Sequence, residues 1–341
     1  MRSIVIACIL LIPSGVASSA SESPSAKALF EAENSLRELT PRLPEMEQEF
    51  SNDPEGLLGL ASLYERYAVS PALGERSEQL YRKAVTLEPQ NKAAFARLAL
   101  RVLVVFTSRR GRLLEQLEMQ RQYALRNNLK EVESLAQGHE LFEWLREKEG
   151  QSYVVIKDFN EARSRLIQKL DRDLPTVLSI LNKGKGLDPD NAVYDYMHAS
   201  LNFDLGKNED ALLEVERGAE KPRLENYRTQ MMSARRKVLL AAGFPNKYRE
   251  IMEKNELNVG VFVRTDKMFE MAEQYEAKHD LANAKRVYEI MLKAADQLRQ
   301  ESIPGQPGGK RGDNEISRRM EAKAKERLTK IRNEVKEDKT Q

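Results

Sequence analysis

Cysteine, histidine, glycine and proline are all scarce in this chain of 341 residues, and each shortage excludes a class of protein. The single cysteine excludes a disulfide framework and a zinc site built from cysteines. The histidines His139, His198 and His279 have no metal-binding spacing on one helix. An excess of one charge is also lacking: 55 Lys and Arg against 53 Asp and Glu leave a net charge of +2. This balance argues against a nucleic-acid binder that relies on a broad basic surface.

The composition favours a helical, folded chain. Hydrophobic residues make up 41% and charged residues 32%, which excludes a polytopic membrane protein and is too apolar for a wholly disordered chain. Six of the 17 glycines and 13 prolines fall between Pro304 and Gly312, so the rest of the chain is poor in turn formers. No clear alternation of apolar and polar residues predicts a sheet, and Tyr153–Ile156 is the one segment that could form a strand. The sequence therefore predicts an all-α fold.

The first twenty residues have the order of a secretory signal. A basic Arg2 precedes an apolar run from Ile4 to Ile12, and small residues follow from Val16 to Ala20. The run is well short of the roughly 20 residues needed to span a bilayer. We expect residues 1–20 to be a cleaved signal peptide, which places the mature chain in the periplasm or outside the cell. The alternative is an uncleaved N-terminal membrane anchor.

Small residues and turns recur along the mature chain. Ala199 and Ala211 are 12 residues apart, and Ala272 and Ala284 repeat that spacing. Small residues at such positions allow two helices of a hairpin to pack closely. Two junctions share the order Leu, acid, Pro, polar, Asn; they are 87–91 and 187–191. The run from Leu98 to Phe106, which is apolar apart from Arg101, is too short to cross a bilayer, so we expect it to be buried.

These spacings resemble the tetratricopeptide repeat, a helix–turn–helix unit of about 34 residues. The resemblance implies an all-α solenoid of helical hairpins over residues 21–300, clearest at 54–106, 175–222 and 265–295. The stretch 107–172 has no repeat signature, and we expect extended helices there, either as degenerate repeats or as an insertion. Residues 223–242 predict a further helix that ends at Gly243. A Gly- and Pro-rich linker at 301–314 precedes a charged amphipathic helix at 315–341.

The resemblance also implies a concave groove that binds a peptide or a partner helix, lined by the first helix of each unit. Family members that bind chaperones place Lys and Asn there to hold a terminal carboxylate, and this sequence does not. An apolar or aromatic segment is the expected ligand, unless these side chains pack against adjacent helices instead. The expected groove residues are Leu58, Ser62, Ala96, Leu100, Tyr196, Ser200, Phe203, Phe269, Glu273 and Glu276.

No catalytic motif accompanies this architecture. Gly184-Lys185-Gly186 lacks the glycine spacing and the Lys-Ser/Thr ending of a phosphate loop, and no nucleophile elbow is present in the sequence. We therefore expect neither an enzyme nor a bound cofactor or metal. The first hypothesis is an exported scaffold that binds a protein or peptide partner in the cell envelope, without nucleic acid or a membrane span. The alternative is a periplasmic component that binds a small solute for a transport system. An enclosed polar pocket would favour the solute, and an open groove would favour the peptide.

Overall fold

The computed structural model describes residues 38–66, 71–126, 159–245, 263–300 and 315–338, together with residues 31 and 34. Every regular element in these ranges is a helix, which confirms the all-α prediction. They hold no strand, and their one β-bridge, between Asn191 and Arg223, is isolated. The expected signal peptide, the expected linker and Tyr153–Ile156 lie outside the described residues.

The N-terminal half contains η1 (Thr40–Arg42), α2 (Leu43–Glu49), α3 (Pro54–Arg66), α4 (Pro71–Leu87) and α5 (Lys92–Arg126). Side chains cap two of these helices. Gly56 N donates a hydrogen bond of 3.2 Å to Asp53 Oδ1 before α3, and Ala94 N donates one of 2.9 Å to Asn91 Oδ1 before α5. The residue order that the junction 87–91 shares with 187–191 thus has a physical role, because its Asn caps the start of the next helix.

The C-terminal half contains α7 (Phe159–Leu170), η2 (Asp171–Asp173), α8 (Leu174–Leu187), α9 (Val193–Asp204), α10 (Asn208–Ala219), α11 (Arg228–Ala241), α13 (Thr265–Ala277), α14 (Leu281–Gln300) and α15 (Glu315–Asp338). Gly243 has a φ of +68° and ends α11 at the predicted position. The described parts of 107–172 form α5 and α7, as expected, and bury Leu113, Leu117 and Leu166.

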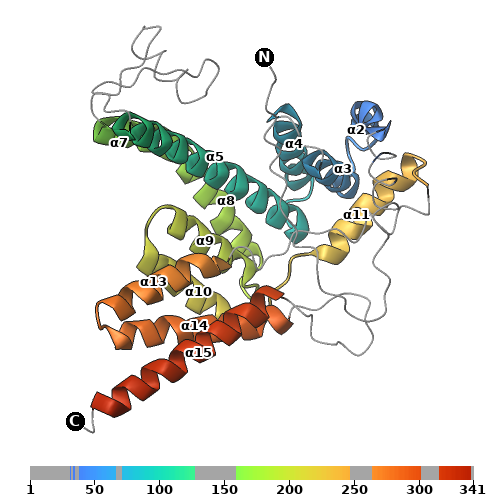
Figure 1. Cartoon of the computed structure of the whole chain (residues 1–341). Coiled ribbons are helices and arrows are strands. Elements are labelled where there is room, and N and C mark those ends of the chain that lie inside the picture. Colours follow the sequence, from blue (N-terminus) through green and yellow to red (C-terminus); the bar gives the residue numbers. More distant parts are fainter. Residues whose placement is uncertain are drawn as a thin grey trace.

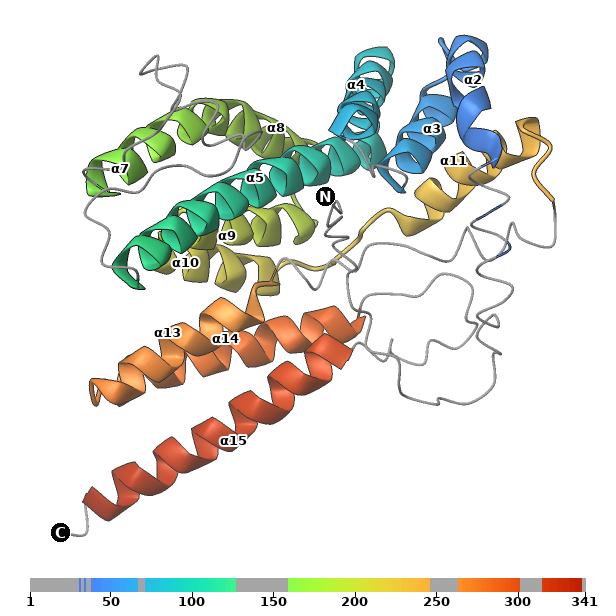
Figure 2. The same ribbon diagram turned by 45° about the horizontal axis from the view of Figure 1, so that its top comes forward.

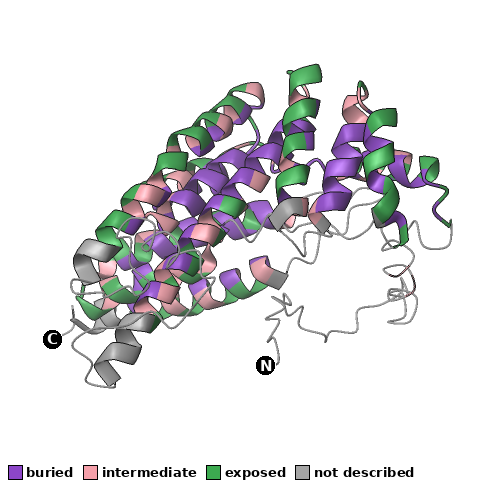
Figure 3. Ribbon diagram, turned by 90° about the horizontal axis from the view of Figure 1, so that it is seen from above, coloured by how far each residue is buried: buried purple, intermediate pink, exposed green. Residues whose placement is uncertain are grey.

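Neighbouring helices pack in pairs and then on one another (Figure 1). The pairs are α3 with α4, α9 with α10, and α13 with α14. Helix α5 contacts α4, α7, α8 and α9, while α10 packs on α14 and α14 on α15. The four alanines of the 12-residue spacing are fully buried, so they allow close helix packing. Figure 3 shows buried positions on the helix faces that meet other helices and exposed positions on the opposite faces.

Helix α11 follows α10 in the sequence but packs on α3, near the N-terminal end of the fold (Figure 2). Arg235 Nε donates a hydrogen bond of 2.6 Å to Ser62 Oγ, and Lys237 Nζ lies 2.5 Å from a carboxylate oxygen of Asp53. Gly59 lets the two helices approach, because a Cβ there would lie 2.2 Å from the Ala234 carbonyl oxygen. The chain thus covers one side of its first hairpin with its own later helix.

A buried carboxylate ties the middle of the fold together. Asp188, in the junction 187–191, is 1% exposed and accepts hydrogen bonds from Lys92 Nζ at 3.0 Å and Asn191 Nδ2 at 3.1 Å. Tyr227 and Arg223 donate to it as well. Burial raises the pKa of Asp188. The hydrogen-bond donors and the positive charge of Arg223 together lower it by more than burial raises it, so the pKa lies below its usual 3.8. The carboxylate therefore joins the start of α5 to the segment before α11.

Candidate functional site

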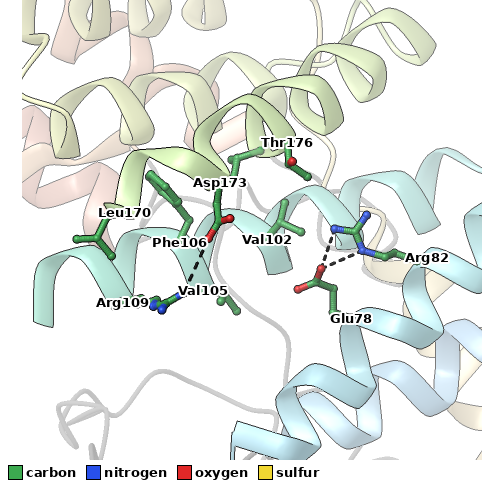
Figure 4. A pocket seen from close by; sticks show the side chains of 10 residues that line it. Glu78, Arg82, Val102, Val105, Phe106, Arg109, Leu170, Asp173 and Thr176 are labelled. Carbon is green, nitrogen blue, oxygen red and sulfur yellow. Dashed lines mark hydrogen bonds and ion pairs between the residues drawn. The ribbon is translucent and has the colours of Figure 1, made fainter. Parts of the chain in front are cut away.

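The candidate site is a cleft of about 270 Å³ over α5, between α4 and the η2–α8 segment (Figure 4). It exists because α4 and α8 both pack on α5, at successive positions along that long helix. Side chains from all these elements line it, and its floor belongs to the second half of the apolar run 98–106. The site is therefore formed by helices that lie about 100 residues apart in the sequence.

Half of the residues that line the cleft are apolar. Val102, Val105 and Phe106 of α5 form the floor, and Leu170 and Val177 complete the apolar part of the lining. Val105 is 37% exposed, one of few large apolar side chains so exposed among the described residues. The run 98–106 was expected to be buried, but Arg101 and Val104 are only partly buried and Val105 is exposed. Covering this apolar surface with a ligand removes it from water, which lowers the free energy, so the cleft suits an apolar ligand.

Two ion pairs border this apolar surface (Figure 4). On α4, Arg82 Nη2 lies 2.7 Å from Glu78 Oε1. Across the cleft, Arg109 Nη1 lies 3.8 Å from Asp173 Oδ2. Side chains of both pairs are partly exposed, so each pair contributes little to stability and its members can turn to a charged group on a ligand. The rim carries both positive and negative side chains, so it does not require a ligand of one particular charge.

The structure buries the expected groove residues of the first two units. Leu58 and Ser62 of α3 are buried, and Ser62 accepts the hydrogen bond from Arg235 of α11. Ala96 and Leu100 of α5 are also buried. They precede Val102, the first residue of α5 that lines the cleft, and do not line it themselves.

The expected groove residues of α9 are buried as well. Tyr196, Ser200 and Phe203 are at most 6% exposed. The Tyr196 hydroxyl donates a hydrogen bond to the side chain of Gln297 on α14, and burial raises the pKa of Tyr196 far above its usual 10. Tyr196 therefore stays neutral and joins the α9–α10 pair to the α13–α14 pair.

On α13 the expected groove residues contact the chain's own C-terminal helix. Lys323 of α15 lies with its Nζ 4.0 Å from the centre of the Phe269 ring, and 3.4 Å from a carboxylate oxygen of Glu273. Arg327 of α15 lies 3.2 Å from a carboxylate oxygen of Glu276. The structure thus does not bring the ten expected residues together as one open surface, and the cleft is lined by other residues. The signal for it in the sequence was the run 98–106, which is apolar on more than one helix face.

A second group of buried polar side chains lies between α8, α9 and α10. Asp195 is fully buried and pairs with Lys185 Nζ at 2.6 Å. Burial lowers the pKa of His198 to about 4, and the nearby positive charge of Lys185 acts in the same direction. Within the described ranges no group of three or more potential ligands has the geometry to hold a metal ion. None of the described helices combines the length and the apolar character needed to cross a bilayer.

Comparisons with protein-family models, with curated proteins and with solved structures find no match to this chain.

Proposed function

We propose that this chain is a non-catalytic, exported scaffold of tetratricopeptide-like hairpins that binds an apolar segment of a protein partner in the cell envelope. Three observations support the repeat assignment: the paired helices, the alanine spacing of 12 residues, and the two similar junctions. Export is supported by the signal-like order of residues 1–20. The single observation that carries the binding function is Val105, an apolar side chain that lines the cleft and is 37% exposed.

The size and lining of the cleft favour a peptide over a small solute. Its volume of about 270 Å³ is below the range of small-molecule sites, which span about 300–1,000 Å³. Its charged side chains pair with one another along the rim instead of converging on one point. A few apolar side chains of a longer segment fit such a cleft, while the rest of the segment lies across α4 and α8.

Site-specific photo-crosslinking tests this function. A benzophenone side chain is installed at position 105, on the cleft floor, or at position 240, where the native Leu240 is 51% exposed on α11. Irradiation in cells, followed by mass spectrometry, should yield a defined partner peptide from position 105 and not from position 240. Equal products from the two positions would reject the cleft as the binding site.

Substitution then measures the affinity for the partner segment identified in this way. Val105→Asp places a charge against the apolar ligand and should weaken binding about tenfold or more. Leu240→Asp makes the same kind of change on an exposed apolar side chain away from the cleft and should leave the affinity unchanged. An unaltered affinity in the Val105→Asp chain, with its helix content intact, would contradict the proposal.

A further inference from the structure

The C-terminal helix α15 packs along the last hairpin through one apolar face (Figure 2). Met320, Ala324 and Ile331 are at most 5% exposed in this contact. Ser317 Oγ also donates a hydrogen bond of 2.6 Å to the Ala295 carbonyl oxygen of α14. The buried residues recur at helical spacing, so the contact has the form of an amphipathic helix bound on a helical pair.

Charge complementarity fixes the register of this helix. Lys323 and Arg327 are one turn apart on α15 and face the acidic pair Glu273 and Glu276 of α13. Lys323 also lies over the ring of Phe269, a cation–π contact. The acidic pair and the ring thus recognise two basic side chains spaced by four residues.

These polar contacts are only partly shielded from water. The side chains of Glu273 and Lys323 are 45% and 43% exposed, so their ion pair is weak and exchanges readily. Fourteen residues, 301–314, join α14 to α15, and a connection of this length gives a tethered helix an effective concentration on the order of millimolar. Attachment to the same chain therefore contributes much of the occupancy of this face by α15.

We propose that the α13–α14 face is a second interaction surface, which binds an amphipathic helix of a partner protein in place of α15. The partner helix has apolar residues at the spacing of Met320, Ala324 and Ile331, and two basic residues at the spacing of Lys323 and Arg327. The helix α15 occupies the face in the free chain, and a partner that binds there releases it. This surface is separate from the cleft at Val105, so the two proposals fail or succeed independently.

The test uses a fluorescent synthetic peptide of residues 315–338 as the probe and measures its binding to the full chain by anisotropy. In the full chain with K323E and R327E, the chain's own α15 places acidic groups against Glu273 and Glu276. The probe should bind this charge-reversed chain about tenfold more tightly than it binds the wild-type chain. The matched control is the full chain with K330E and R332E, which changes the net charge equally at exposed positions of α15 and should bind the probe as the wild type does.

A probe peptide that itself carries K323E and R327E should not bind any of these chains. The proposal is overturned if the unmodified probe fails to bind the charge-reversed chain while circular dichroism shows an intact helix content. It is also overturned if the control chain gains affinity to the same extent. Wild-type dimers that the probe dissociates, seen by light scattering, would assign this face to a second copy of the chain and reject a separate partner.

Discussion

A single methyl group at Gly59 should separate α11 from α3. A Cβ at this position would lie 2.2 Å from the carbonyl oxygen of Ala234 and 2.8 Å from Val238 Cγ2. The nearer atom belongs to the backbone of α11, which is itself held by helical hydrogen bonds and cannot move alone. Gly59→Ala therefore forces the whole of α11 away from α3 or deforms one of the two helices.

Two opposing terms set the magnitude. Adding an atom to a well-packed contact costs about 1–3 kcal/mol. Replacing glycine by alanine inside a helix gains about 0.5–1 kcal/mol. The net expectation for Gly59→Ala is a loss of about 1–2 kcal/mol in the free energy of unfolding. Gly111, within α5, is the matched control, because a Cβ there meets no atom within 4 Å. Gly111→Ala should therefore stabilise the chain by about 0.5–1 kcal/mol.

Urea unfolding followed by circular dichroism measures both variants, with the free energy extrapolated linearly to water. The decisive observation is the sign: the two glycine-to-alanine changes should move the unfolding midpoint in opposite directions. Refutation comes from midpoints that move together, or from a Gly59→Ala chain as stable as the wild type. Either result would mean that α3 and α11 are not in the close contact described above.

Three further predictions concern buried polar groups. Asp188→Asn should destabilise the chain by about 2 kcal/mol in urea unfolding at pH 7, because Lys92 and Arg223 lose their shared carboxylate. Since the pKa of Asp188 is lowered, its stabilising contribution is present above pH 3.8 and is lost as the pH falls, so the two chains should converge in acid. The pKa of His198 is lowered to about 4 from 6.5, so only the unfolded chain takes up its proton between these values, and stability should fall by about 3 kcal/mol as the pH drops through that window. His198→Gln should flatten this fall in urea midpoints measured from pH 7 to pH 4, and an unchanged slope would contradict the assignment. Tyr196→Phe leaves the buried Gln297 oxygen without its donor and should lower the free energy of unfolding by about 1–2 kcal/mol, whereas an unchanged melting temperature would show that this bond is not formed.

Local features of the sequence predicted local structure well. Gly243 ends α11 and the alanines at the 12-residue spacing are buried. Each of these depends on residues within one or two helical turns, whose capping, φ preference and size act without the rest of the chain. The repeat assignment and the signal peptide stay predictions, and the crosslinking experiment above addresses the partner.

The candidate site was less accessible to sequence reasoning. The expected groove residue Ser62 is covered by α11, and Phe269 and Glu273 contact α15. An amphipathic pattern states that one helix face is buried, but it does not state which helix buries it. Val105 was expected to be buried for the same reason, because the run that contains it is apolar on more than one face.

The sequence alone determined that this chain is helical, where several helices begin and end, and which small residues allow close packing. These properties follow from backbone preferences and from short-range periodicity. Only the tertiary structure decided that α11 returns to α3, that α15 lies on α13 and α14, and that a cleft opens over Val105. Such contacts join residues more than 150 positions apart in the case of α3 and α11, and they depend on shape and charge complementarity between whole surfaces.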